Sequence, residues 1–478
     1  MSPWMWLVVL CALAFSLAAA RAQQAPVNVG SAKQLFIDDW LIASRQGVRL
    51  TMNPPVKTGE RNLVPDKPWE GHRLCAYNSV FEDQGIFKMY YDAIDNEGHR
   101  WLCLALSTDG IHWRKPSLGV VDYKGSPDNN IVFPPQAKSH EPGCVFIDSN
   151  PDCPPEQRYK MVASYEGPGG FGTYVCYSGD GLRWKPLSDK PSFRPSDTGN
   201  VAFWDERIGR YVAYVRMWNP MRTVGRCEFD DLRDFGGEQE VFRYDEQDPP
   251  DLDLYTNSAI KYPYAENAYF IFPAAYHHYP EPPAGKHRND GPLDVRMAVS
   301  RDGVNFTYVD RSPFVPLGIA GEFDDSTAYM ATGVIRNGNE LYMYYHGCDF
   351  THGDYNPERD KFVGTISRLV LRLDGYVSAD AEYGGGTLTT VPLVFNGKRL
   401  ELNVQTSVAG TVGVEIQDPE GAAIPGFALS DCGVIKGNYT RKVVTWRGSS
   451  DLSALAGRAI RLHFLMRDAK LYAIQFVE

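Results

Sequence analysis

The chain has 478 residues, and its 48 Lys and Arg against 59 Asp and Glu give a formal charge of −11 at pH 7. This acidity repels phosphate backbones and anionic membrane surfaces, so neither nucleic acid nor membrane is expected as a partner. With 43% hydrophobic and 22% charged residues, the composition is that of a globular protein. The 44 Gly and 33 Pro indicate frequent turns, which suit many short strands better than long helices.

The first 22 residues have the features of a signal peptide. Every residue of 5–20 except Ser16 is apolar, and Ala20-Arg21-Ala22 fits a cleavage site between small residues. The stretch is too short to span a bilayer comfortably. We therefore expect a secreted or periplasmic protein whose mature chain begins at residue 23.

The cysteines do not form a recognisable metal or redox motif. After removal of residues 1–22 they are Cys75, Cys103, Cys144, Cys153, Cys176, Cys227, Cys348 and Cys432. None lies in a CxxC pair, several lie in apolar strand-like runs, and a chain of this length does not need disulfides to fold. Buried free thiols are favoured over disulfides.

A turn motif repeats along the middle of the chain. Ser, Asp and Gly followed by an aromatic residue recur as Ser107, Asp109, Gly110 and Trp113; Ser178, Asp180, Gly181 and Trp184; and Ser300, Asp302, Gly303 and Phe306. About 70 residues separate the first two glycines and about 120 the next two, which leaves room for a missing copy. Residues 231–235 form that degenerate copy, and Asp374-Gly375-Tyr376 is a fifth, weaker one. Each motif predicts a hairpin in which glycine takes a positive φ.

Two strand-like runs precede each turn. The first runs, small and apolar, are 78–81, 143–147, 200–203, 257–260 and 329–335, and the second, aromatic runs are 87–91, 159–162, 211–215, 268–272 and 341–345. Strands in this order, closed by a hairpin, are typical of the blades of a β-propeller. The repeat predicts five blades over residues 60–378.

The remaining segments flank these repeats. Residues 23–59 hold a strand, 34–42, that could close the ring by joining the last blade. Residues 379–478 begin with a Gly-rich linker and continue with alternating apolar runs, which predict a small β-sandwich. The predicted fold is all-β, a five-bladed β-propeller followed by a C-terminal β-sandwich.

Acidic residues stand just ahead of the predicted innermost strands, which in a propeller start around the central axis. They are Glu70, Glu141, Asp197, Asp251, Asp253, Glu322, Asp324 and Asp325. Cleavage of a glycosidic bond needs one carboxyl group that protonates the leaving oxygen and one carboxylate that activates water or attacks the sugar. The structural alternative for each single residue is a turn-capping side chain.

The blade pattern, the Ser-x-Asp-Gly-x-x-Trp turns and the carboxylates together resemble the five-bladed glycoside hydrolases of families 43 and 32. The trailing sandwich is similar to the accessory domain of family 32. Closer still is the likeness to uncharacterised exported bacterial glycosidase-like proteins that open on Leu-Phe-Ile-Asp-Asp, here Leu35 to Asp39. The family motifs Asn-Asp-Pro-Asn, Arg-Asp-Pro and Glu-Cys are absent, so no residue role transfers directly.

Other side chains are candidates for substrate binding. They are Asp38, Arg216, Tyr255, His277, His278, Glu322 and His346. The histidines follow the second strands of the last two blades, which would bring them together to contact sugar hydroxyls or, with carboxylates, to bind a metal. Ordinary loop histidines are the alternative. No cofactor and no metal ligand set is predicted, although a structural calcium ion is left open.

The leading hypothesis is an exported glycoside hydrolase whose acid and base come from Glu70, Glu141, Asp197, Asp253 and Asp325. Asp197 and Asp253 are expected as base or orienting groups, and Glu141 as the proton donor. The alternative from another class is a propeller that binds glycans without cleaving them. A sialidase would need three arginines for its substrate carboxylate and a tyrosine nucleophile, and a phosphorylase would need a cluster of basic residues. Neither set is evident in the sequence.

Overall fold

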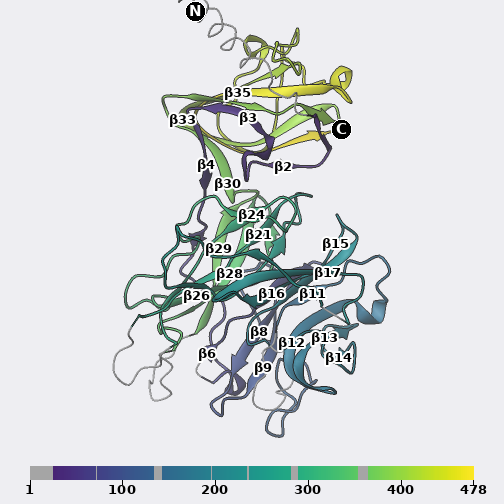
Figure 1. Cartoon of the computed structure of the whole chain (residues 1–478), viewed down its shortest axis with the longest axis vertical. Coiled ribbons are helices and arrows are strands. Elements are labelled where there is room, and N and C mark those ends of the chain that lie inside the picture. The colour runs from purple at the N-terminus through teal and green to yellow at the C-terminus, as the bar shows by residue number, and fades with distance from the viewer. Residues whose placement is uncertain are drawn as a thin grey trace, which may run out of the picture. The chain divides into compact units, whose positions relative to one another are not determined.

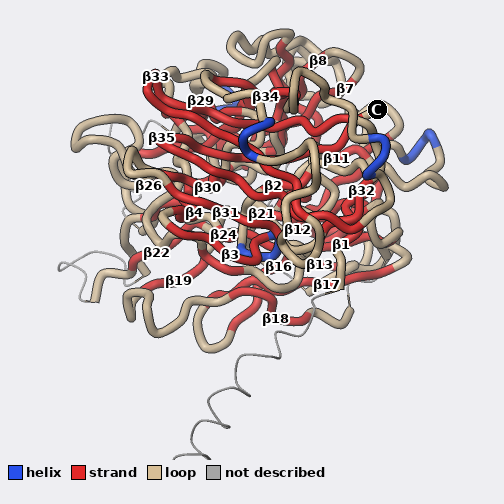
Figure 2. The backbone as a smooth tube through the Cα atoms, turned by 90° about the horizontal axis from the view of Figure 1, so that it is seen from above, coloured by secondary structure: helices blue, strands red, loops and turns tan. Residues whose placement is uncertain are grey.

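The computed structural model describes residues 25–71, 73–133, 143–194, 196–233, 236–280, 289–353 and 364–478. Their regular structure is almost entirely β-strand (Figure 2). The helical elements are the short 3₁₀ turns η1 (Asp39–Leu41), η2 (Pro68–Glu70), η3 (Pro155–Gln157), η4 (Leu429–Asp431) and η5 (Ser453–Leu455). Among these residues no helix is long and apolar enough to cross a membrane. The predicted signal peptide lies outside the described residues.

The chain divides into two compact units: residues 1–49 with 379–478 form unit 1, and residues 50–378 form unit 2. The first three sheets of unit 2 follow one another along the chain (Figure 1). They comprise β6 (Arg73–Leu74), β7 (Ser79–Asp83), β8 (Ile86–Ile94), β9 (Arg100–Ser107) and β10 (Ile131–Phe133); β11 (Val145–Ile147), β12 (Tyr159–Gly167), β13 (Gly170–Ser178) and β14 (Lys185–Pro186); and β15 (Val201–Asp205), β16 (Arg210–Trp218), β17 (Arg222–Phe229) and β18 (Gln239–Phe242). Neighbouring strands within each sheet are antiparallel.

The rest of unit 2 forms a four-stranded and an eight-stranded sheet. The smaller consists of β20 (Ile260–Lys261), β21 (Tyr269–Ile271), β24 (Ala298–Ser300) and β25 (Thr307–Tyr308). The larger consists of β19 (Leu252–Leu254), β22 (Ala274–His277), β23 (Leu293–Val295), β26 (Thr327–Met330), β27 (Ile335–Asn337), β28 (Glu340–Cys348), β29 (Thr365–Arg372) and β5 (Val56–Lys57). A parallel pair, Leu293 with Thr327, joins its two halves.

The apolar core of unit 2 lies between successive sheets. Tyr90 on β8 packs with Met161 and Cys176 of the second sheet. Its neighbour Tyr91 points to the opposite face and packs with Tyr342 and Tyr344 of β28, in the last sheet. Because successive strand residues face opposite sides of a sheet, a strand buried on both faces reads as a continuous apolar run. The first sheet therefore lies between the second and the last, an arrangement like that of propeller blades.

The repeated turns fasten each sheet to a neighbour. Ser107 and Asp109 accept hydrogen bonds from the backbone of the turn, and Gly110 has φ +71°. The Gly110 carbonyl accepts a hydrogen bond of 2.5 Å from the Tyr344 hydroxyl of the last sheet, and Trp113 packs edge-on against the same tyrosine. Two further turns repeat this contact, with Tyr90 donating to Gly181 at 3.0 Å and Tyr214 donating to Gly303 at 2.7 Å. The aromatic residue of the motif thus packs against a tyrosine of the adjacent sheet.

The N-terminal segment contributes to both units. Val56 in β5 pairs antiparallel with Val370 and supplies an edge strand to the last sheet of unit 2. The run 34–42, which was expected to do this, pairs inside unit 1 instead: Leu35 lies opposite Ala473, and Ile42 lies opposite Thr390. The strands of the C-terminal segment supply the pairing partners of residues 34–42. The sequence of 34–42 alone does not indicate which of the two sheets it joins.

Unit 1 is built around two 19-residue strands. The strands assigned to its sheet are β1 (Val27–Gly30), β2 (Gln34–Leu35), β3 (Ile42–Gln46), β4 (Val48–Met52), β30 (Val377–Ala381), β31 (Gly386–Thr390), β32 (Leu393–Phe395), β33 (Arg399–Gln417), β34 (Asn438–Val443) and β35 (Ala459–Val477). Val412, Val414 and Ile416 of β33 are buried and alternate with more exposed residues, which places one face of the sheet in a core.

All eight cysteines within the described residues are free, and six of them are buried. The expectation of buried thiols rather than disulfides is therefore confirmed.

Candidate functional site

Residues at or near the innermost strands of unit 2 meet around a small internal cavity. Its lining comes from five stretches of chain and consists of Tyr77, Cys144, Gly199, Asn200, Val201, Thr256, Ser258, Tyr329, Met330 and Thr332. The cavity has about 10 Å³ of space, room for about one water molecule. This cavity is therefore too small to hold a sugar ring.

Aromatic rings form a layer beside the cavity. Tyr255, Tyr276 and Tyr329 belong to one buried cluster with Ala76 and Leu293. The ring of His352 lies 4.7 Å from that of Tyr255 and 4.9 Å from that of Tyr276. These residues come from separate stretches of unit 2. The sequence predicts that the histidine-bearing loops of the last two repeats meet, and His352 and His278 both lie against Tyr276, the His278 ring at 3.9 Å.

Two buried arginines lie over this aromatic layer. The guanidinium groups of Arg216 on β16 and Arg222 on β17 are 4.4 Å and 4.9 Å from the Tyr255 ring centre. Arg222 also lies 4.6 Å from the ring of Trp218, whose side chain is 56% exposed. The two arginines flank the hairpin that joins β16 to β17, and this hairpin brings both cations to one place.

Asp253 is fully buried and paired with a cation. One carboxylate oxygen accepts the backbone N–H of Arg222 at 2.6 Å, and the other contacts its guanidinium and lies 3.2 Å from Nε2 of His278. Burial acts to raise the pKa of Asp253, but the hydrogen bond with His278 and the Arg222 charge outweigh it and lower that pKa. The group is thus held as an anion in a position fixed by three contacts.

Asp197 occupies the accessible side of the same cluster, with 71% of its side chain exposed. Its carboxylate contacts the Arg216 guanidinium, and the second Arg216 nitrogen donates to the Tyr255 carbonyl at 2.7 Å. We call Asp197, Arg216, Trp218, Arg222, Asp253, Tyr255, Tyr276, His278 and His352 the axial cluster. It combines one exposed carboxylate, one buried carboxylate, two cations and an exposed indole.

A third carboxyl group, Asp92 on β8, adjoins the cluster through its neighbours. Asp92 is fully buried and binds Arg100. The Arg100 guanidinium lies 5.8 Å from the Tyr77 ring. The Tyr77 hydroxyl donates to the Asp197 carbonyl at 3.1 Å, which connects Asp92 to the cluster. Burial raises the pKa of Asp92 to about 6 even though Arg100 and Arg73 oppose the shift. Oδ1 of Asp92 is buried without a hydrogen-bond partner among the described residues.

The histidines of this region differ in their surroundings. Burial and the nearby charges of Arg222 and Arg216 lower the pKa of His352 to about 4, so it is neutral at pH 7. His346 is buried, lies 2.8 Å from the Leu74 carbonyl, and burial lowers its pKa to about 3. His277 lies 3.5 Å from Asp294. Of the three histidines predicted to bind substrate, only His278 belongs to the axial cluster.

Several predicted site residues lie outside the cluster. Glu70 is fully buried, and its carboxylate accepts from the Asp66 and Lys67 backbone, Tyr91 and Lys115, so its oxygens are occupied in a structural network. Asp325 caps a loop by accepting from Gly321 and Ser326. Glu322 is exposed on the same loop, and Asp38 of unit 1 caps η1 by accepting the Trp40 N–H at 3.1 Å. Glu141 lies outside the described residues.

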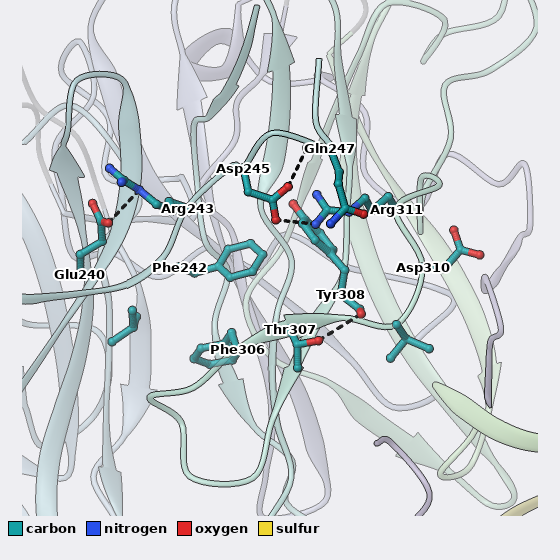
Figure 3. Close-up of a pocket in the computed structure, with 12 residues that line it drawn as sticks. Glu240, Phe242, Arg243, Asp245, Gln247, Phe306, Thr307, Tyr308, Asp310 and Arg311 are labelled. Carbon is teal, nitrogen blue, oxygen red and sulfur yellow. Dashed lines mark hydrogen bonds and ion pairs between the residues drawn. The ribbon is translucent and has the colours of Figure 1, made fainter. Parts of the chain in front are cut away.

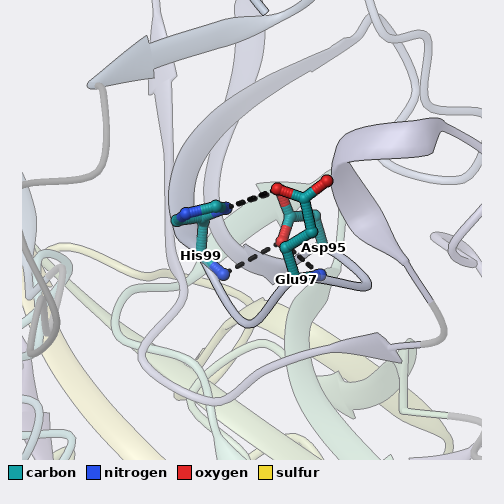
Figure 4. A group of neighbouring side chains, drawn as sticks. All are labelled: Asp95, Glu97 and His99. Carbon is teal, nitrogen blue, oxygen red and sulfur yellow. Dashed lines mark hydrogen bonds and ion pairs between the residues drawn. The ribbon is translucent and has the colours of Figure 1, made fainter. Parts of the chain in front are cut away.

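Asp95, Glu97 and His99 form a group whose potential metal-binding atoms lie within 4.8 Å of one another (Figure 4). Asp95 already accepts the backbone N–H groups of Glu97 and His99, and its second oxygen lies 3.1 Å from Nδ1 of His99. Glu97 pairs with Lys124. The contacts of the hairpin turn thus engage the same atoms that a metal ion would need.

Five members of the cluster are predicted from the sequence as site residues: Asp197, Arg216, Asp253, Tyr255 and His278. Arg222, Trp218, Tyr276 and His352, and Asp92 beside the cluster, are added by the structure. A signal for Arg222 was present, because Arg216 and Arg222 stand at the two ends of an aromatic hairpin beside Trp218. Asp92 gave no signal, since it lies within a strand and not ahead of one.

No protein-family model matches the chain, and no curated protein matches it. Solved structures with similar architecture include an N-acetylgalactosamine deacetylase from F. plautii in complex with blood group B trisaccharide, at 14% identity and a TM-score of 0.46 over 68% of this chain and 95% of that one. A glycosyl hydrolase from Bacteroides ovatus matches at 16% identity and a TM-score of 0.41 over 73% and 99%. A structure from the GH130 family of mannoside phosphorylases, which contains hydrolases of β-1,2 mannosidic linkages, matches at 15% and 0.39 over 73% and 99%. Glycoside hydrolases are thus among the similar structures, as the sequence resemblance predicted, and similarity at this level carries no conclusion about activity.

Proposed function

We propose that the protein is an exported glycoside hydrolase that binds and cleaves its substrate at the axial cluster. The observation that carries this proposal is the convergence of Asp197 and Asp253 on two arginines that share one aromatic ring, Tyr255. Glycosidic cleavage needs one carboxylate that reacts with water or sugar and a separate proton donor; the exposed Asp197 can take the first role, and the buried Asp253 fixes the position of Arg222. The exposed Trp218 next to Arg222 offers a flat apolar surface for a sugar ring.

The proposed architecture is a five-bladed propeller followed by a β-sandwich. In this description β19 with β20 forms the innermost strand of the fourth blade, interrupted at 255–259, and β22 with β21 forms its second strand. The remaining half of the eight-stranded sheet, β26 to β29 with β5, is the fifth blade. The axial cavity, lined by five stretches of chain, supports this count. The long strands β33 and β35 of unit 1 support the sandwich.

The carboxyl groups take different roles in the proposed reaction. Asp197, open to solvent and held by Arg216, activates the attacking water or attacks the anomeric carbon. Asp253 orients the substrate through Arg222 and His278 and is not itself the base, because its oxygens are occupied. Two residues are candidates for the proton donor: Glu141, from its position ahead of a predicted strand, and Asp92, whose pKa of about 6 leaves it partly protonated near neutral pH.

A non-catalytic glycan-binding propeller is the second candidate. It is favoured by the pairing of both carboxylates of the cluster with arginine, since ion-paired carboxylates readily accept hydrogen bonds from sugar hydroxyls without transferring a proton. The two functions differ in turnover and share the same binding site.

The test is release of reducing sugar from a panel of plant, fungal and host glycans by the purified protein. On any substrate that is cleaved, Asp197→Asn should lower kcat by orders of magnitude. Because a general acid must be protonated to act, the donor is the residue, Asp92 or Glu141, whose replacement (Asp92→Asn or Glu141→Gln) removes the alkaline limb of the rate profile. Asp180→Asn, in a turn on another part of unit 2, serves as a matched control. Binding without release across the panel favours the second function, and undiminished turnover in Asp197→Asn removes that residue from the site.

Export has its own test. The proposal predicts that the protein expressed in a bacterial host with its own N-terminus is recovered outside the cytoplasm, beginning at Gln23. Recovery of the protein in the cytoplasm with residues 1–22 retained contradicts it.

A further inference from the structure

A second concavity of unit 2 lies between the edge strands β18 and β25 (Figure 3). Its volume is about 790 Å³, within the range of cavities that hold small ligands. The walls are residues 240–243, 245 and 247 on one side and residues 306–311 on the other. We call this cavity the rim groove, and it shares no lining residue with the axial cluster.

One part of the groove is aromatic. Phe242 packs against Tyr308 at 4.9 Å and against Phe306 at 6.4 Å, both edge-on. The Arg311 guanidinium covers the Tyr308 ring at 4.8 Å. The Tyr308 hydroxyl is buried and has no hydrogen-bond partner among the described residues. The groove thus combines apolar ring surface with a polar group that its own surroundings leave unpaired.

The two arginines of the groove are paired with carboxylates, and Asp310 adds a further negative charge to the lining. Arg243 pairs with Glu240 at 2.9 Å, and Arg311 pairs with Asp245 at 2.5 Å and with Asp248 at 2.8 Å. Figure 3 shows the first two of these pairs on the groove wall. With each arginine matched by a carboxylate, no uncompensated cation is left to attract an anionic ligand. The paired side chains keep further donors and acceptors, which suits a neutral ligand rich in hydroxyl groups.

The groove is tied to the hairpin of the axial cluster. Arg243 donates to the Asn219 carbonyl at 2.6 Å, and the Asn219 amide lies 3.3 Å from Glu240. Asn219 directly follows Trp218 and lies on the β16–β17 hairpin, between the two axial arginines. A single hairpin therefore connects the groove wall to the site of proposed chemistry.

We propose that the rim groove is a second carbohydrate-binding site, which takes neutral sugar residues of a glycan. Aromatic edges supply apolar contact with the ring carbons, and the paired Glu240, Arg243, Asp245 and Arg311 with Gln247 and Thr307 exchange hydrogen bonds with hydroxyl groups. The proposal goes beyond the proposed hydrolase, because the groove would bind sugar whether or not the axial cluster cleaves it.

The test is calorimetric titration of the full-length protein with neutral hexasaccharides of glucose, xylose, mannose and arabinose, and with a galacturonate hexasaccharide as the acidic probe. Gln247→Ala combined with Thr307→Ala removes two exposed groove side chains that support no other contact across the groove. Glu246→Ala, an exposed neighbour that does not line the groove, is the control. Arg222→Gln provides a protein whose axial cluster is altered and whose groove side chains are unchanged, and circular dichroism at the titration temperature checks that it is folded.

We expect at least one neutral hexasaccharide to bind wild type, Glu246→Ala and Arg222→Gln with similar affinity, and the groove double variant to bind it about five-fold or more weakly. Unchanged affinity in the double variant, loss of binding in Arg222→Gln, preference for the acidic probe, or no binding of any neutral hexasaccharide overturns the inference. If the double variant binds the hexasaccharide normally and glycan is still hydrolysed, the rim groove is not the binding site, and the proposal for the axial cluster is unaffected. If the groove binds sugar but no glycan is hydrolysed, the proposed chemistry at the axial cluster is wrong, and the proposal for the rim groove is unaffected.

Discussion

Replacing Tyr344 with phenylalanine tests whether the tyrosine–turn contacts hold neighbouring sheets of unit 2 together. The Tyr344 hydroxyl donates to the Gly110 carbonyl at 2.5 Å and thereby connects the last sheet to the first. Tyr344→Phe keeps the ring, which packs edge-on against Trp113 at 5.5 Å, and removes only this hydrogen bond. The Gly110 carbonyl is then buried without its partner, which costs about 1–3 kcal/mol of unfolding free energy.

Urea unfolding followed by tryptophan fluorescence measures this effect, and Trp113 reports directly on the contact. The midpoint should fall while the slope stays the same, because the surface exposed on unfolding does not change. Tyr214→Phe, which removes the equivalent 2.7 Å hydrogen bond to Gly303, should lower the midpoint similarly. Tyr177→Phe is the control, since Tyr177 on β13 makes no side-chain hydrogen bond in the described structure. A Tyr344→Phe protein as stable as wild type and the Tyr177 control would refute the reasoning.

Three further predictions concern the buried histidine and the axial cluster. Burial lowers the pKa of His346 to about 3 from an unfolded value of about 6.5, so the unfolded chain binds the extra proton and stability falls as the pH drops through this window. His346→Gln should therefore remove about 2–3 kcal/mol of the stability loss between pH 6.5 and pH 4.5, measured as urea midpoints of variant and wild type at both pH values; the same pH dependence in the two proteins would contradict this. Arg222→Gln leaves the buried Asp253 carboxylate without its cation and should lower unfolding free energy by about 3 kcal/mol, measured against the exposed Arg183→Gln; equal midpoints would show that the pair is not essential. Trp218→Ala should raise KM about ten-fold with little change in kcat on any cleaved glycan, and a kcat loss of similar size would place the indole in the chemical step instead of in binding.

The repeat was readable from the sequence because its physical cause is local. Serine and aspartate accept hydrogen bonds from the turn backbone, and glycine takes the positive φ, so the Ser-x-Asp-Gly pattern is needed wherever that turn occurs. The second sheet has Val162 at the position of Tyr90, Tyr214 and Tyr344, and the degenerate turn at 231–235 belongs to the repeat that follows it.

The candidate site was only partly readable, because the role of an acidic side chain depends on partners far away in the sequence. Glu70 and Asp253 look alike in the chain, yet Glu70 is bound by Lys115 in a structural network while Asp253 meets Arg222 and His278. Asp92 could not be found by looking ahead of strands, since its raised pKa comes from burial inside β8. The prediction that residues 34–42 join the last blade is wrong for a similar reason. An apolar run indicates that a strand forms, but it does not indicate which sheet the strand joins.

A crystal structure of Asp197→Asn with a bound oligosaccharide, chosen from the glycan panel, tests most directly whether the axial cluster is the site of action. The proposal predicts a sugar ring against Trp218, with hydroxyl groups in contact with Arg222 and with Asn in place of Asp197. A glycan bound only elsewhere on the protein, with the axial cluster empty at saturating ligand, would contradict it.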